Sequence, residues 1–381
     1  MDFTLTASQQ KYVKEARTVA EMIAPGYKQR EIDRLIAPEL RLDIGGRGLI
    51  APELPVELGG RGERRLTSGL ITEEIARGDF NVAYLQVVGS LVGQILAQSA
   101  KPAVAARWVP KIASGEEIVA IGLSEPGAGS DAGNPSLTAR RERGGWVLNG
   151  TKSMSFAKQC GATVVFAKTD PEQRRGRGIS AFLVDMAGDG LEVEGVNDMG
   201  TRAVTRGFVH FTDAWIPEDH LIGDEGAGFT QVMQGFDFSR ALIGLQCIGA
   251  AAVTVEETWA HVSSRQAFDQ PLSKFQGVSF PLAESETLLT AARLLCHQTL
   301  WLKDEGLPHT SQAAMCKWWA PKTAYDVINS CLLLHGQFGY MQDLPIEQRM
   351  RDVLGLQIGD GTAQIMKLII ARQSVGREFA P

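Results

Sequence analysis

The sequence predicts a mostly α-helical α+β protein in which helices come first, a compact sheet domain follows, and a helical bundle ends the chain. Two changes of hydrophobic period carry this prediction. The helical period that runs to about Ser114 gives way to short alternating runs after Glu117, and it returns beyond Gly228. The length of 381 residues agrees, because one hydrophobic core rarely serves so long a chain. We therefore expect three domains, at residues 1–118, 119–226 and 227–381.

Each region supplies recognisable elements. In the first, apolar residues at helical spacing between caps and glycines predict the helices Ser8–Ile23, Glu31–Gly46, Leu66–Arg77 and Asn81–Ser99. In the second, runs rich in Val, Ile, Phe and Thr predict the strands Thr163–Ala167, Ile179–Val184 and Phe208–Phe211. In the third, long helical segments joined by short loops predict an antiparallel bundle of Phe229–Ser263, Lys274–Glu305, Ser311–His335 and Pro345–Arg377, the last with a break near Gly359.

Composition narrows the function classes. The net charge is −6, and the densest basic cluster, Arg174, Arg175 and Arg177, lies among glycines in an expected surface turn, so we expect no nucleic-acid partner. The five cysteines lack CxxC or Cys/His spacing, which favours reduced, buried thiols and no metal site. The N-terminus lacks the features of a signal peptide, and we expect no membrane-crossing stretch. A cytoplasmic protein is the resulting expectation.

The segment Gly122–Asp131 carries the first chemical signal. Its three glycines let the backbone approach a planar or phosphorylated ligand, while Ser124 and Ser130 add hydroxyl groups. Taken alone, such a segment is more often an ordinary loop between domains.

The whole string nevertheless resembles the signature of acyl-CoA dehydrogenases, and further segments extend the resemblance along nearly the entire chain in the family's order. Asn149–Lys152 looks like the turn that opens the family's flavin-facing strand. The other matching segments are Glu53–Gly62, Ile216–Gly223, Gly226–Phe229, Phe236–Arg240, Arg265–Phe268 with Pro271 and Gln276, and Ile358–Gln364.

The resemblance implies FAD bound between the sheet domain and the bundle, with paired subunits completing each other's cofactor sites. It assigns Leu123 and Ser124 to the flavin ring, and Ser130 to the pyrophosphate or the pantetheine. It gives Arg265, Phe268 and Gln276 the pyrophosphate and adenosine of a neighbouring subunit's cofactor, for which an arginine fork is well suited. The remaining cofactor contacts implied are Gly129, Met154, Ser155, Phe156, Leu333, Gly336, Gln337, Thr362 and Gln364.

For the substrate, the resemblance implies contacts from Ser130, Gly361, Asp237 and Arg240. The last two stand one turn apart at the expected start of the first bundle helix, so they share a face. Outside the family context, such a pair is more often an intrahelical ion pair.

Asp360 stands where the family usually carries the glutamate that removes the substrate's α-proton. An aspartate between Gly359 and Gly361 could also simply cap a helix. The chemistry requires a base, however, because a proton leaves Cα while Cβ delivers hydride to flavin N5. Aspartate is shorter by one methylene, about 1.5 Å. Some relatives place the base just before the Arg240 position, where this chain has Ser239.

These departures suggest a remodelled site, since Gly359 replaces a tyrosine, and Met154 and Phe156 replace a common Trp and Thr. We expect FAD-dependent α,β-dehydrogenation of an acyl-CoA, with a branched or cyclic substrate such as cyclohexanecarboxyl-CoA as the hypothesis. Electron-transfer flavoprotein as acceptor and a homotetramer, a dimer of dimers, follow from the resemblance. Two alternatives remain open: a nitroalkane-oxidase-like oxidase that uses Asp360 as base, and a non-catalytic member that only binds flavin or acyl-CoA.

Overall fold

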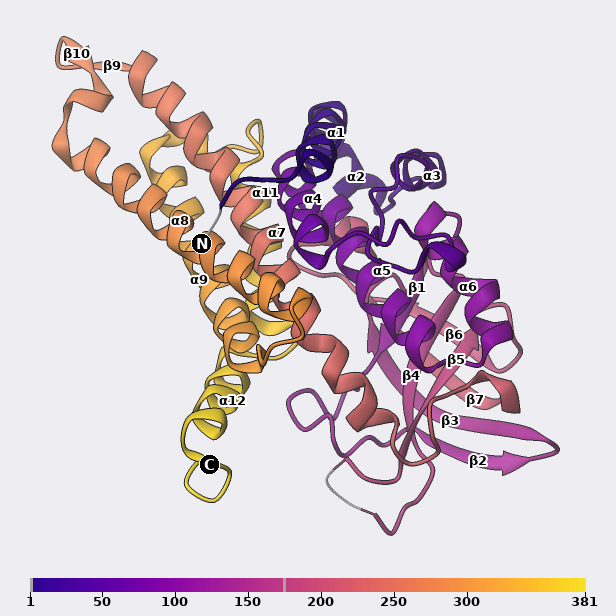
Figure 1. The fold of residues 1–381 in the computed structure, drawn as a ribbon. Helices are drawn as coiled ribbons and strands as arrows, with labels where there is room; N and C mark the ends of the chain where they lie inside the picture. Colours follow the sequence, from indigo (N-terminus) through magenta and orange to yellow (C-terminus); the bar gives the residue numbers. More distant parts are fainter. Residues whose placement is uncertain (1–2, 174–175) are drawn as a thin grey trace.

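The computed structural model describes residues 3–173 and 176–381. Within the second range, only the backbone is described for residues 230–234. Arg174 and Arg175 of the basic cluster lie outside the described residues. Figure 1 shows the three predicted regions in chain order, with the first helices beside the sheet and the last helices forming a long bundle. The mostly helical α+β fold with a central sheet domain is confirmed.

Among its described residues, the first region contains six α-helices. Their bounds are α1 Ala7–Ile23, α2 Tyr27–Asp33, α3 Pro38–Gly46, α4 Arg65–Gly78, α5 Phe80–Ser99 and α6 Pro102–Ser114. The prediction of one helix over Glu31–Gly46 is wrong. The chain leaves α2 at Arg34, which takes a left-handed φ of 51°, and α3 starts at Pro38, whose ring suits a first helical turn.

The helix α5 begins at a strong cap. The carboxylate of Asp79 accepts hydrogen bonds from the backbone N–H groups of Asn81 (2.7 Å) and Val82 (3.2 Å). Beyond the cap, nearly every side chain of α5 is buried between the sheet and the bundle. The helix α5 is therefore a buried core helix rather than a surface helix.

The expectation that no stretch is apolar enough to cross a bilayer is wrong on length and composition. The segments Phe80–Ser99 and Gly235–Ser264 both pass that test, but 89% of each apolar window is buried inside the protein. Their apolar character is therefore explained by core packing.

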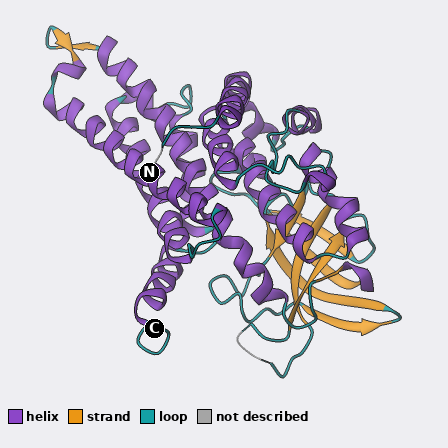
Figure 2. Ribbon diagram, viewed as in Figure 1, coloured by secondary structure: helices purple, strands orange, loops and turns teal. Residues whose placement is uncertain are grey.

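The middle region is a mixed sheet, drawn in orange in Figure 2. Its strands are β1 Val119–Gly122, β2 Thr138–Glu142, β3 Gly145–Met154, β4 Ala162–Lys168, β5 Ile179–Asp185, β6 Leu191–Gly195, β7 Gly207–Pro217 and β8 Leu221–Ile222. The strand order is β6-β7-β3-β2-β4-β5-β8, and β1 pairs in parallel with β4.

Asn149–Lys152 is not the turn that the sequence predicted. It lies inside β3, where the pairing with β7 shifts register between Leu148 and Gly150. Gly150 has a φ of 138°, and a Cβ there would lie 2.9 Å from Cα of Leu137. The glycine therefore marks a bulge in a continuous strand rather than the end of one.

The last region is the bundle, with α7 Gly228–Ser264, α8 Gln276–Asp304, α9 Thr310–Leu334, α10 Gln337–Tyr340, α11 Ile346–Ile358 and α12 Ala363–Val375. A small hairpin, β9 Gln266–Ala267 and β10 Gln270–Pro271, joins α7 to α8 at the tip of the bundle (Figure 1). The predicted break near Gly359 is confirmed, because α11 ends at Ile358 and α12 begins at Ala363.

The long helix α7 links the three regions. It packs against α4 and α5 of the first region, against β5 of the sheet, and against α8 and α9 of the bundle. Asp237 lies about 2.5 turns into α7 rather than at its start.

Candidate active site

Asp360 lies in the short segment between α11 and α12, and its backbone conformation is unusual. Its φ of 55° is left-handed, and the following Gly361 has a φ of 98°. A residue other than glycine in this region costs about 1 kcal/mol, so the surrounding structure must hold it there.

The buried ammonium of Lys317, on α9, holds this segment. Its Nζ donates to the carbonyl oxygens of Leu356 (2.6 Å) and Gly361 (3.1 Å), which stand on either side of Asp360. The carbonyl of Gly361 is thus already engaged, although the sequence suggested this residue as a substrate contact. Sequence reasoning also missed Lys317, whose only local signal is a charge within an apolar helical run.

Several groups set the basicity of Asp360. Burial raises the pKa of its carboxyl, opposed by the Lys317 ammonium, a hydrogen bond from Tyr84, and the Arg240 and Arg206 guanidinium groups. Burial in turn lowers the pKa of Lys317 to about 8, against the effect of the Asp360 carboxylate. A carboxyl with a raised pKa is the stronger base once it is deprotonated.

The Gly122–Asp131 loop is open where a ligand would approach it. Ser124, Gly129 and Ser130 are exposed, and a Cβ at Gly127 or Gly129 would have no neighbour within 4 Å. Ser124 is tied to β3, because its carbonyl accepts a hydrogen bond from the Ser153 N–H at 2.8 Å. Leu123 at the head of the loop is half-buried.

Glu125, in the same loop, is buried and serves the loop itself. Its carboxylate accepts from the Lys152 ammonium (2.7 Å) and from the backbone N–H groups of Ser136 (2.6 Å) and Leu137 (3.0 Å). Burial disfavours the charged form, but Lys152 and Ser136 lower the pKa of Glu125 below its usual value. The pair Glu125 and Lys152 therefore fixes the loop, a role that the sequence did not reveal.

The three residues expected at the flavin face differ in orientation. Phe156 is fully buried, and Met154 is 3% exposed, with its sulfur 3.3 Å from the Thr163 hydroxyl. Both side chains pack inside the protein, and their contact with the flavin stays a prediction. Ser155 is half-buried and remains the candidate of the three.

Asp237 and Arg240 form the ion pair that their spacing allowed. Arg240 Nη1 lies 2.6 Å from Asp237 Oδ1, and the Thr310 hydroxyl donates to Asp237 Oδ2 at 2.6 Å. The Nε of Arg240 is buried and has no hydrogen-bond partner among the described residues. A substrate contact for this pair stays a prediction. Ser239 beside it donates to the Phe236 carbonyl at 3.1 Å and carries no acidic group.

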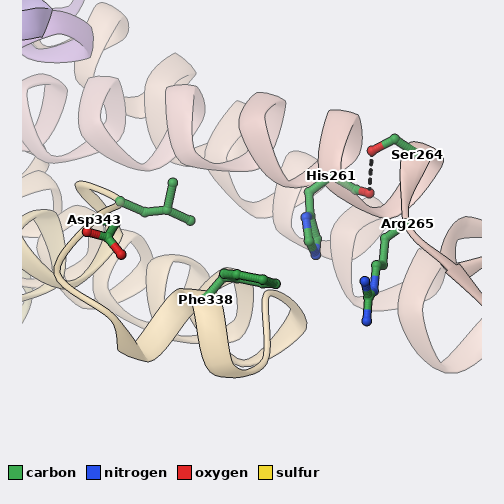
Figure 3. A pocket seen from close by; sticks show the side chains of 6 residues that line it. His261, Ser264, Arg265, Phe338 and Asp343 are labelled. Atoms are coloured by element: carbon green, nitrogen blue, oxygen red, sulfur yellow. Dashed lines mark hydrogen bonds between the residues drawn. The ribbon is translucent and has the colours of Figure 1, made fainter.

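A second group of predicted residues gathers at the far end of α7. A cavity of about 390 Å³ there is lined by His261, Ser264, Arg265, Phe338, Asp343 and Leu344. Figure 3 shows this pocket from close by. The ring of His261 stacks on that of His335 at 4.3 Å. The neighbouring segment presents Leu333, Gly336 and Gln337 to solvent.

Other predicted cofactor residues lie near these two places. Phe268 is 90% exposed in the β9–β10 hairpin, and Gln276 begins α8. Gln364 is exposed on the first turn of α12. The Thr362 hydroxyl caps that helix by accepting from the Ile365 N–H at 3.4 Å, so its oxygen already has a partner.

The two groups are far apart. Arg240 and Arg265 are separated by about 25 residues of α7, which corresponds to about 37 Å. The structure therefore places Arg240, which faces Asp360, far along α7 from the predicted residues around Arg265.

Models of the N-terminal, middle and C-terminal domains of acyl-CoA dehydrogenases match residues 6–116, 120–214 and 226–375. The human short-chain specific acyl-CoA dehydrogenase is 36% identical over 86% of this chain and 80% of its own. The chain belongs to the acyl-CoA dehydrogenase family. It is thus an FAD-dependent oxidoreductase with an acyl-CoA dehydrogenase type of function.

Other members match over the full length. The acryloyl-CoA reductase (NADH) of Anaerotignum propionicum is 32% identical over 99% of this chain and 97% of its own. Butyryl-CoA dehydrogenase from Megasphaera elsdenii superposes with a TM-score of 0.94 at 28% identity, covering 98% of this chain and 99% of that one. A glutaryl-CoA dehydrogenase in complex with glutaryl-CoA gives 0.95 at 28% identity, covering 100% and 98%.

The residues present fit FAD. The glycine loop leaves open space for a planar ring, and Arg265 lines a cavity able to take an anionic group.

All five cysteines are free and buried, as expected from their spacing. Among the described residues, no three His, Cys, Asp or Glu side chains gather as a metal site would require.

Proposed function

We propose that Asp360 is the base of this acyl-CoA dehydrogenase and that it removes the α-proton of the thioester. The observation that carries the proposal is the position of the carboxyl. It lies between α11 and α12 with its backbone held by Lys317, and its pKa is raised by burial. No other carboxylate replaces it on α7, where Ser239 occupies the alternative position.

The chain also supplies a donor for the thioester carbonyl. Among the described residues, the backbone N–H of Asp360 makes no hydrogen bond, so it is free to stabilise the negative charge that develops on that oxygen. FAD, when bound, supplies the acceptor for the hydride that leaves Cβ. Asp360 takes the proton from Cα, and the electrons of the two C–H bonds are divided between the new double bond and the departing hydride.

We further propose a compact acyl group, branched or cyclic at the α-carbon, such as cyclohexanecarboxyl-CoA. The aspartate reaches about 1.5 Å less than a glutamate, so Cα must approach the α11–α12 segment more closely. A tertiary α-carbon held in a ring offers one fixed C–H bond to such a base. Several relatives, by contrast, are short-chain specific acyl-CoA dehydrogenases.

A second copy of the chain completes the proposed enzyme. Because Arg240 and Arg265 are about 37 Å apart along α7, the Arg265 cluster serves the cofactor of a neighbouring subunit in this proposal. Apolar side chains exposed along α8 support an assembly, and a homotetramer is proposed. They are Phe280, Leu288, Leu294 and Trp301.

Electron-transfer flavoprotein is the proposed electron acceptor. One solved structure that superposes with a TM-score of 0.95 at 30% identity comes from work on the electron transferring flavoprotein of Acidaminococcus fermentans. Reoxidation of the reduced enzyme by such a flavoprotein, but not rapidly by oxygen, would support this acceptor and exclude the oxidase alternative.

The substrate is tested by anaerobic titration of the FAD-loaded protein with butyryl-CoA, isobutyryl-CoA and cyclohexanecarboxyl-CoA, followed by flavin absorbance. We expect the cyclic or branched thioester to bleach the flavin faster than butyryl-CoA. Bleaching by butyryl-CoA alone would refute the compact-substrate proposal and keep the dehydrogenase. No bleaching by any thioester, with rapid oxygen-dependent turnover of a nitroalkane, would refute both.

A further inference from the structure

Tyr84 connects the three regions of the protein at Asp360. It belongs to α5 in the first region, and its hydroxyl lies 3.4 Å from Oδ2 of Asp360 in the bundle. On its other side, its ring stacks on that of Phe156, just after β3, with centroids 5.8 Å apart and ring planes 25° apart. The ring is thus fixed by aromatic packing while the hydroxyl points at the carboxylate.

We infer that Tyr84 is a positioning residue for the base, which holds Oδ2 of Asp360 by a hydrogen bond and leaves Oδ1 to take the substrate proton. The inference rests on the proposed role of Asp360. Within the described part of the chain, Oδ1 has no hydrogen-bond partner, so the two oxygens are not equivalent.

The need for such a contact follows from the length of the base. A short side chain on a left-handed backbone has little freedom to adjust its reach, so small errors in orientation matter. Lys317 fixes the backbone on both sides of Asp360, but it does not touch the carboxylate. Among the described residues, Tyr84 is the side chain whose hydrogen bond restrains the carboxylate itself.

The ionisation of Tyr84 suits a permanent donor. Burial and the nearby Asp360 carboxylate raise the pKa of the phenol, so the hydroxyl keeps its proton at any working pH. Ser155 and Arg206 lie close enough to oppose this rise in part.

The charged and titratable groups that face Asp360 come from separate elements. Lys317 faces it from α9, Arg240 from α7, and Arg206 from the segment before β7, while Tyr84 faces it from α5. The three cations stay in place when the Tyr84 hydroxyl is removed. A change in the titration of Asp360 in a Tyr84 variant would therefore report the lost hydrogen bond.

The test compares wild type, Tyr84→Phe and Asp360→Asn, each loaded with FAD, by the rate of anaerobic flavin reduction as a function of pH. Tyr84→Phe keeps the ring on Phe156 and removes only the oxygen. We expect a rate about 10-fold lower at neutral pH and a shift of the acidic limb to higher pH, because the charged carboxylate loses a donor. The thermal midpoint and FAD content should stay unchanged, which a merely structural role would not predict.

The outcomes separate the two proposals. If Tyr84→Phe leaves the rate of flavin reduction and the acidic limb of its pH profile unchanged while Asp360→Asn is inactive, the role of Tyr84 is overturned. The assignment of Asp360 as the base then stands. Wild-type reduction in Asp360→Asn would overturn both. If Tyr84→Phe does not fold, Tyr84→Met fills a similar volume without a hydroxyl, and the same rate loss and alkaline shift are expected.

Discussion

The Lys317 ammonium lies 3.1 Å from the carbonyl oxygen of Gly361, across the segment that carries the proposed base. This contact joins the interior of α9 to the break between α11 and α12. The contact explains how the backbone of Asp360 is held at its left-handed φ.

Replacing Lys317 by methionine should loosen that segment. The buried Leu356 and Gly361 carbonyls would lose their donor, so we expect the free energy of unfolding to fall by about 1–3 kcal/mol. Because the ammonium lowers the pKa of Asp360, its loss should also move the acidic limb of flavin reduction to higher pH. Chemical denaturation and anaerobic kinetics measure the two effects. Lys322→Met, an exposed lysine on the same helix, is the control and should change neither.

The buried pair of Glu125 and Lys152 should matter for stability more than a surface pair. Lys152→Met leaves the Glu125 carboxylate without its cation, and breaking such a pair costs about 3–5 kcal/mol. Denaturant unfolding of Lys152→Met beside Lys111→Met tests this, since Lys111 pairs with Glu116 on the surface. Equal, small losses in the two variants would show that the buried pair does not stabilise the loop.

Asp352 should give the fold a measurable pH dependence. It accepts hydrogen bonds from the Tyr27 hydroxyl (2.6 Å) and the Asn81 amide (2.9 Å) of the first region, and from the Thr201 N–H (2.5 Å) of the middle region. Burial raises the pKa of Asp352 to about 7, above the value of about 3.9 in an unfolded chain.

The sign follows from this difference. Between about pH 4 and pH 7 the unfolded chain releases the proton while the folded protein keeps it, so the stability that this group contributes falls as pH rises. Asp352→Asn cannot ionise, and its stability deficit against wild type should shrink over this range, by up to about 4 kcal/mol. Unfolding free energies of both proteins at pH 5 and pH 8 measure the trend, and a constant deficit would contradict it.

Arg265→Met should weaken cofactor binding without affecting the fold. The guanidinium lines the cavity at the end of α7, and losing its charged hydrogen bonds should raise the Kd for FAD about 10- to 100-fold. Titration of the apoprotein followed by flavin fluorescence measures the Kd. Arg372→Met, an exposed arginine on α12, is the matched control. An unchanged Kd in Arg265→Met would exclude this cavity from the cofactor site.

Local sequence predicted the architecture well because helical and strand periods are local properties. The break near Gly359 and the buried cysteines followed from such patterns. The end of α2 at Arg34 did not, because the left-handed φ of this arginine does not alter the spacing of apolar residues along the sequence.

The site was only partly predictable, because its decisive contacts join distant segments. Tyr84 and Asp360 are 276 residues apart, and Tyr84 and Lys317 both belong to helices whose patterns indicate only core packing. Family resemblance identified Asp360 but not what holds it. It also placed Phe156 at the flavin; that contact stays a prediction, and the structure buries the side chain in the turn just after β3, at a left-handed φ of 58°.

Asp360→Asn tests the central claim most directly. The amide keeps the size of the side chain and cannot accept the α-proton, so anaerobic flavin reduction by the preferred acyl-CoA should slow by about 10²- to 10⁴-fold while FAD content is unchanged. Reduction of the flavin at the wild-type rate in this variant would contradict the assignment of Asp360 as the base.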